Sequence, residues 1–99
     1  MTYVVGGITF RTKNDVREHA RKVLNSAVLG EELTGGEASF VGDLFRAHPN
    51  YAAKRGNGVH FFYVGVIPAW ETRNFLLYRL DGTFDNFSIK KCVGNMSSD

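Results

Sequence analysis

Apolar side chains recur every three to four positions in two stretches of the chain, which is the spacing of one face of an α-helix. The first stretch comprises Val16, Ala20, Val23, Leu24 and Ala27, and the second comprises Phe40, Val41, Leu44 and Phe45. Thr12 or Asn14 can cap the first helix and Gly30 can end it. The second helix is predicted from about Glu37 to Ala47, because a helix rarely continues through a proline such as Pro49.

The second half of the chain is rich in aromatic and β-branched residues and predicts strands over residues 59–67, 73–80 and 84–89. Asp81-Gly82 is a hairpin signal between the last two. Residues 3–5 and 8–10 flank Gly6-Gly7 and predict a short strand or a tight hairpin, and residues 50–58 predict a loop. The pattern predicts an α+β fold, in which two helices pack on an antiparallel sheet in the order β-α-α-β-β-β.

Length and composition limit the chain to one small domain. Its 99 residues allow a single core, and an apolar fraction of 43% is enough to build it. We expect the domain to span residues 1–93, followed by a flexible tail over 94–99, whose Gly, Asn and Ser residues have little to bury. Cys92 is the only cysteine, which excludes an intrachain disulfide and a cysteine-based zinc site. We expect a cytoplasmic protein with no membrane partner, because the sequence shows no signal peptide and no long apolar run.

Charged residues are segregated along the chain, although the net charge is only +2. Residues 11–22 contain five bases and two acids, residues 31–43 contain four acids and no base, and residues 46–55 contain three bases and no acid. Such a bipolar chain can turn a basic face toward a polyanion. The acidic segment favours a different class, a protein-interaction module, which stays open as an alternative.

Two basic groups of residues are candidates for phosphate contact. Lys13, Arg17 and Arg21 recur every four residues, so they share one stripe of the first helix. The alternative is a solvated helix face on which Glu18 pairs with Lys22. The segment AKRGNG at 53–58 combines two cations with two glycines, which can cradle phosphate or form an ordinary surface turn.

Four consecutive residues with aromatic rings, at positions 60–63 of the strand predicted over 59–67, help to distinguish RNA or single-stranded DNA from duplex DNA as the ligand. Phe61 and Tyr63 should lie on one face of the sheet, with His60 and Phe62 on the other. Rings exposed on the sheet favour RNA or single strands, because unpaired bases stack on them, whereas buried rings favour duplex DNA.

No catalytic arrangement is visible in the sequence. The three histidines, His19, His48 and His60, lack metal-ligand spacing, and Asp81-Gly82-Thr83 is typical of a turn rather than of a catalytic site. We expect no enzymatic activity, no cofactor, no metal and no small-molecule substrate.

Five short motifs in the chain resemble those of the DCL (defective chloroplasts and leaves) domain family. They are FRTKND at 10–15, LFRAHPN at 44–50, AKRGNG at 53–58, FLLYRLDGT at 75–83 and FSIKKC at 87–92. The polar matches are Lys13, His48, Lys54, Arg79 and Lys91. The resemblance implies that Lys13, Lys54 and Lys91 contact phosphate, and that His48, Asp81 and Ser88 are mainly structural.

The resemblance also implies a link with nucleic acid. Members of the family are associated with chloroplast ribosomal RNA maturation, occur at the end of plant RNA polymerase largest subunits, and accompany homing-type nuclease domains in bacteria and phages. We therefore expect a free-standing bacterial or phage-type member that binds nucleic acid without catalysis. Its regulatory role would be that of a repressor, or of a competitor related to the specificity module of a homing-type nuclease.

Double-stranded DNA is the expected ligand, with structured RNA and a protein partner as alternatives and a homodimer left open. Arg55 and Arg73 are the candidates for contact with base edges. The predicted nucleic-acid-binding residues are Lys13, Arg17, Arg21, Lys54, Arg55, Arg73, Arg79, Lys90 and Lys91.

Overall fold

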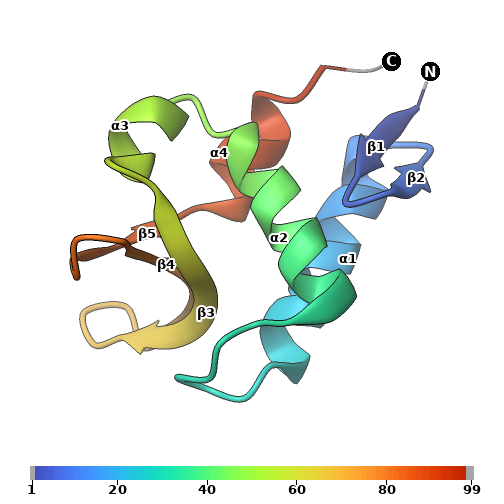
Figure 1. The fold of residues 1–99 in the computed structure, drawn as a ribbon. Helices are drawn as coiled ribbons and strands as arrows, with labels where there is room; N and C mark the ends of the chain where they lie inside the picture. Colours follow the sequence, from blue (N-terminus) through green and yellow to red (C-terminus); the bar gives the residue numbers. More distant parts are fainter. Residues whose placement is uncertain (1, 98–99) are drawn as a thin grey trace.

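A computed structural model describes residues 2–97 of the chain (Figure 1). In chain order the elements are β1 (Tyr3–Val5), β2 (Ile8–Phe10), α1 (Lys13–Ser26), α2 (Gly35–Arg46), α3 (Tyr51–Arg55), β3 (Val59–Ile67), β4 (Thr72–Arg79), β5 (Phe84–Phe87) and α4 (Ile89–Gly94). The strands form two antiparallel sheets, β1-β2 and β3-β4-β5. The α+β class predicted from the sequence is confirmed.

The observed elements differ in detail from the predicted order. Of the two alternatives for the N-terminal apolar residues, the tight hairpin is the one observed, because Gly6 and Gly7 take the positive φ angles that its turn requires. It adds one strand to the predicted order. The predicted loop 50–58 contains the short helix α3, and the predicted strand 84–89 ends at Phe87. There Ser88 caps α4 by accepting a hydrogen bond from the Lys91 amide at 3.4 Å.

The two long helices begin and end close to their predicted limits. The hydroxyl of Thr12 accepts a hydrogen bond from the Asp15 amide at 3.1 Å and so caps α1. The helix ends at Ser26, four residues before Gly30, whose φ of +81° turns the chain in the following loop. Residues 30–33 of that loop pair with the outer edge of β3, where the Leu33 amide donates to the Phe62 carbonyl at 2.8 Å.

The core lies between the three-stranded sheet and helices α1, α2 and α4. Figure 1 shows α1 and α2 side by side on one side of this sheet. The fully buried side chains come from all of these elements: Val16 and Ala20 from α1, Phe40, Val41, Leu44 and Phe45 from α2, Val64, Phe75 and Leu77 from the sheet, and Cys92 and Val93 from α4. Burial raises the pKa of the Cys92 thiol to about 12.

The end of the chain is partly docked on the helices. Gly94 is the last residue of α4, the Asn95 side-chain amide donates to the Ala47 carbonyl at 2.9 Å, and Met96 packs against the core. The flexible tail predicted for 94–99 extends over residues 98 and 99, which lie outside the described residues, and its flexibility stays a prediction. None of the helices in residues 2–97 is long and apolar enough to cross a membrane.

Candidate nucleic-acid interface

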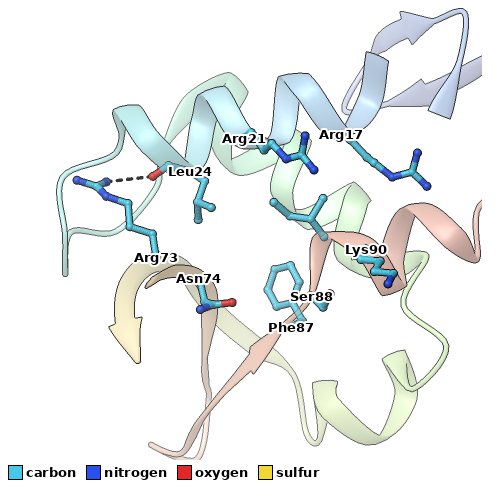
Figure 2. A pocket seen from close by; sticks show the side chains of 9 residues that line it. Arg17, Arg21, Leu24, Arg73, Asn74, Phe87, Ser88 and Lys90 are labelled. Carbon is cyan, nitrogen blue, oxygen red and sulfur yellow. Dashed lines mark hydrogen bonds between the residues drawn. The ribbon is translucent and has the colours of Figure 1, made fainter. Parts of the chain in front are cut away.

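Four of the predicted cations line one groove, here called the basic groove (Figure 2). It is a cavity of about 490 Å³ lined by Arg17, Arg21, Leu24, Arg73, Asn74, Phe87, Ser88, Ile89 and Lys90. The lining contains four cations and no acidic side chain. A groove of this charge attracts a polyanion, and its apolar floor leaves the cations at the rim.

Local structure explains how the cations come together. Arg17 and Arg21 are separated by four residues of α1, so both project from the same side of that helix. The cap at Ser88 starts α4 immediately after β5 and places Lys90 in its first turn. Arg73 comes from β4, so three separate elements contribute to the rim.

Arg73 has a structural role as well. Its Nη1 atom donates to the Leu24 carbonyl at 3.0 Å and to the Ala27 carbonyl at 2.7 Å, and Figure 2 shows the first of these bonds. The last turn of α1 has no basic residue of its own, so Arg73 supplies the cation that the carbonyl end of a helix favours. This anchor engages Nη1 in the fold, and the base contact of Arg73 stays a prediction.

The other three cations of the basic groove are free within residues 2–97. Both ion pairs found in that part of the chain are made by Asp85, and none of the side-chain hydrogen bonds there involves Arg17, Arg21 or Lys90. The side chain of Glu18 accepts a hydrogen bond from the side-chain amide of Asn14 at 3.4 Å and makes no ion pair with Lys22. The cations therefore remain available to an anionic ligand.

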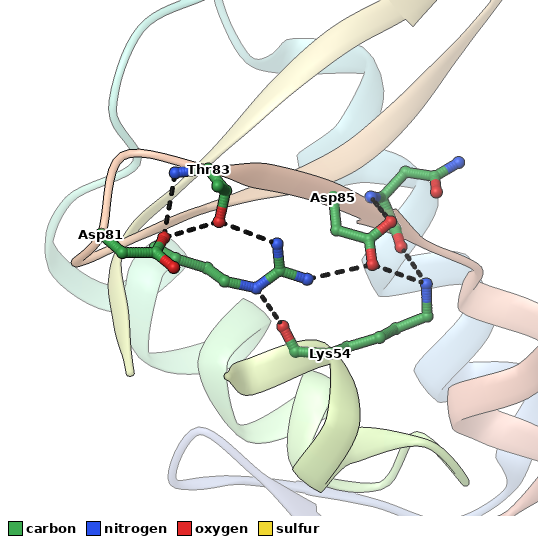
Figure 3. A network of polar contacts seen from close by, with 6 residues as sticks. Lys54, Asp81, Thr83 and Asp85 are labelled. Atoms are coloured by element: carbon green, nitrogen blue, oxygen red, sulfur yellow. Dashed lines mark hydrogen bonds and ion pairs between the residues drawn. The ribbon is translucent and has the colours of Figure 1, made fainter. Parts of the chain in front are cut away.

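Lys54 and Arg79, by contrast, belong to a structural network (Figure 3). Asp85 Oδ2 accepts from Lys54 Nζ at 3.3 Å and from Arg79 Nη2 at 3.1 Å. Lys54 Nζ also donates to the Asn86 carbonyl at 2.8 Å, and Arg79 Nε donates to the Lys54 carbonyl at 2.7 Å. The network ties α3 to β4 and β5, so these two predicted nucleic-acid-binding residues have a folding role.

The pKa values of the acids nearby reflect these bonds. Burial opposes ionisation of Asp85, but the Asn86 amide, the Lys54 ammonium and the Arg79 guanidinium outweigh it, and its pKa is lowered. The pKa of Asp81 is lowered because the Thr83 hydroxyl and amide donate to its carboxylate. This is the arrangement of a stabilised turn, as predicted for Asp81-Gly82-Thr83.

His48 is buried, and its Nδ1 atom accepts from the Asn50 amide at 2.9 Å. Burial, reinforced by the charges of Lys54 and Lys91, lowers its pKa, while Asp85 acts in the opposite direction. His48 is thus a neutral side chain that holds the turn after α2. In residues 2–97 no cluster of three or more His, Cys, Asp or Glu side chains is placed to hold a metal ion.

The remaining predicted residues lie outside the basic groove. Lys13 Nζ donates to the Gly94 carbonyl at 3.2 Å, and Lys91 is exposed on α4. Arg55 places its guanidinium 5.6 Å from the ring centroid of Tyr51. Sequence reasoning missed Arg46, which lies near Arg55; its only signal was membership of the basic segment 46–55.

Aromatic side chains also cover the sheet face that points away from the core. The register pairs Phe61 with Tyr78 and Tyr78 with Phe84, which is 65% exposed. His60 lies with this cluster, 5.3 Å from Phe61 and 6.3 Å from Tyr78 between ring centroids. Its predicted place on the opposite face was wrong, because the bulge between Val59 and Phe61 breaks the alternation of side chains.

Comparison with known proteins identifies a family. Residues 21–93 match the model of a family described as "Protein of unknown function (DUF3223)". A solved structure, the solution NMR structure of an uncharacterized protein from Rhodospirillum rubrum, matches with a TM-score of 0.80 and 29% identity, over 91% of this chain and 86% of that one.

Two curated proteins of Arabidopsis thaliana are also similar. The chain is 29% identical to DNA-directed RNA polymerase IV subunit 1 over 85 residues, which are 86% of this chain and 6% of that protein. It is 42% identical to Protein EMBRYO DEFECTIVE 514 over 48 residues, which are 48% of this chain and 24% of that protein. The chain therefore spans a small part of either relative.

Proposed function

The chain belongs to the DUF3223 family, which is the DCL-related family, and from this premise we propose that it is a module that binds duplex nucleic acid through the basic groove. The observation that carries the proposal is that Arg17, Arg21 and Lys90, which make no ion pair within residues 2–97, line one groove together with Arg73 and without an acidic side chain. Phosphates of a nucleic-acid backbone are the natural partners of such a rim, because each cation that neutralises a phosphate releases condensed counterions.

The exposed rings of the open sheet face favour RNA or a single strand by the criterion given for the sequence, but the charge distribution favours a duplex. The side chains that cover the open sheet face are aromatic or aliphatic and offer no cation to a phosphate: Phe61, Tyr63, Leu76, Tyr78 and Phe84. Proteins that stack successive unpaired bases usually combine such rings with cations that follow the backbone. Four cations of this domain line the basic groove instead, where a backbone can lie across the rim.

Double-stranded DNA is the ligand we propose, with structured RNA as the alternative. One relative is by name a DNA-directed RNA polymerase subunit, which is consistent with a domain that works beside nucleic acid. Occupation of a DNA site by a small non-catalytic domain would make it a regulator, repressor-like in action. A bacterial or phage origin, and kinship with the specificity modules of homing-type nucleases, belong to the same proposal.

The test is the salt dependence of binding to labelled duplex DNA, followed by fluorescence anisotropy. Arg17→Gln/Arg21→Gln should weaken binding. It should also flatten the slope of the log binding constant against log salt concentration by about two units, because each phosphate contact contributes about 0.9 to that slope. The matched control is Arg11→Gln/Lys22→Gln, which removes the same charge from residues that do not line the basic groove. Its slope should stay close to that of the wild type.

Two results would count against the proposal. The first is a wild-type protein that binds no duplex at low salt. The second is an equal loss in both double variants, which would assign binding to net charge rather than to the groove. Tighter binding to a hairpin RNA, with the same dependence on Arg17 and Arg21, would keep the groove and change the ligand to RNA.

A further inference from the structure

A second groove lies between α2, α3 and β3, away from the basic groove, and is here called the α2–α3 groove. It has a volume of about 230 Å³ and is lined by Gly42, Phe45, Arg46, Tyr51, Arg55, Val59 and Phe62. Its floor is aromatic and its charged lining consists of two arginines. Arg46 and Arg55 are exposed, and neither makes an ion pair within residues 2–97.

Gly42 gives this groove its open space without being required by the fold. It lies inside α2, where glycine is less favourable than alanine, and it does not have a positive φ angle. A Cβ atom at this position would meet only the Phe62 ring outside the helix, at 3.4 Å. Neither backbone conformation nor a close backbone approach explains the glycine, whereas an occupant of the groove would.

The two grooves share no lining residue. Phe45 lines the α2–α3 groove and Phe87 lines the basic groove, and their ring centroids are 4.9 Å apart. The α2–α3 groove is therefore a separate site next to the basic groove, and its occupant has to be argued from its own lining.

We propose that the α2–α3 groove binds one unpaired nucleotide, an inference that rests on the proposed function. Its base would stack on the aromatic lining at Phe62, and its phosphate would lie between Arg46 and Arg55. Stacking on an aromatic side chain combined with a charge-assisted contact from arginine is how unpaired nucleotides are usually held. The guanidinium of Arg55 is already positioned near the Tyr51 ring, 5.6 Å from its centroid.

Three DNA probes separate this site from the basic groove: a blunt duplex, the same duplex with a short single-stranded extension at its 3′ end, and the same duplex with the extension at its 5′ end. In the wild type, one of the two extensions should raise affinity about tenfold, since a stacked base contributes strongly to binding. Arg17→Gln/Arg21→Gln should weaken binding of all three probes alike.

Variants of the α2–α3 groove should lose only the rise in affinity that the single-stranded extension provides. Gly42→Ala narrows the groove and Gly42→Leu fills it without changing charge, so the gain should fall in that order while binding of the blunt duplex stays constant. Alanine is more favourable than glycine in a helix, so Gly42→Ala should keep or raise the thermal midpoint of the wild type, which excludes misfolding as the cause. Arg46→Gln/Arg55→Gln should lose the gain more completely than the control Arg11→Gln/Lys22→Gln.

The outcomes separate the two proposals. A wild type that binds the blunt duplex but gains nothing from either extension would overturn the nucleotide site and leave the proposed function standing. A gain that survives in Gly42→Leu would overturn the site as well. A protein that binds none of the probes would overturn both.

Discussion

Asp85→Asn should destabilise the fold by about 2 kcal/mol, because the carboxylate of Asp85 holds two cations at once. It accepts from Lys54 at 3.3 Å and from Arg79 at 3.1 Å. A hydrogen bond to a charged group contributes about 1.5–3 kcal/mol when it is well shielded. Here the side chains of Lys54, Asp85 and Arg79 are 22%, 33% and 15% exposed, so solvent screening reduces each bond to about 1 kcal/mol.

The effect should depend on pH in a defined direction. The pKa of Asp85 is lowered in the folded state, so its contribution is complete above the unfolded value of about 3.9. That contribution is lost as the pH falls through the lower folded value. The wild type and Asp85→Asn should therefore differ at pH 7 and converge in strong acid.

Urea unfolding, followed by the fluorescence of Trp70 or by circular dichroism, measures both effects. The matched control is Asp81→Asn, which removes a carboxylate that is bonded only within its own exposed turn and should cost less than Asp85→Asn. The reasoning is refuted if Asp85→Asn lies within about 0.5 kcal/mol of the wild type at pH 7, the range of an ordinary surface substitution. A confirmed effect would also show that a Lys54 variant cannot report on phosphate binding unless its folding is measured.

Three further predictions concern stability and reactivity. Gly6→Ala should lower the free energy of unfolding in urea clearly more than Gly7→Ala does. Both glycines have a positive φ angle, but only at Gly6 would a Cβ atom collide with backbone, 2.5 Å from Phe40 Cα. Equal losses in the two variants would contradict this. Since the pKa of His48 is lowered, its contribution to stability is present above the unfolded value of about 6.5 and is lost as the pH falls below it. In a series of urea midpoints measured at falling pH, His48→Asn should reduce the loss of stability below about pH 6.5. If the loss is unchanged, it arises from another titrating group. The Cys92 thiol, with a pKa of about 12, should react with a disulfide reagent only after unfolding, and rapid reaction in native buffer would contradict its burial.

Local patterns predicted most of the fold. The periodicity of the two long helices, the cap at Thr12 and the strand over 59–67 all depend on neighbours within a few positions, which a single sequence displays. The short helices α3 and α4 were not predicted, since five or six residues offer little periodicity to detect. The bulge that moves His60 to the other face likewise leaves no mark in the alternation of residue types.

The candidate site was harder to predict because it depends on distant contacts. Arg17 and Arg21 were recognisable as neighbours by their spacing along one helix. Their meeting with Arg73 and Lys90 depends on how α1, β4 and α4 pack. The partner of Lys54 is 31 positions away, so nothing near AKRGNG reveals that this lysine is engaged in the fold.

The bond between Arg73 and the end of α1 has a kinetic consequence. It ties β4 to the helix that carries Arg17 and Arg21, so we expect the walls of the basic groove to keep their separation when a ligand binds. On the proposed function, a site that needs no rearrangement would capture its ligand in a single encounter, at a rate governed by long-range attraction and reduced by added salt. In stopped-flow experiments the observed association rate should rise linearly with DNA concentration and show no plateau, since no opening step precedes capture.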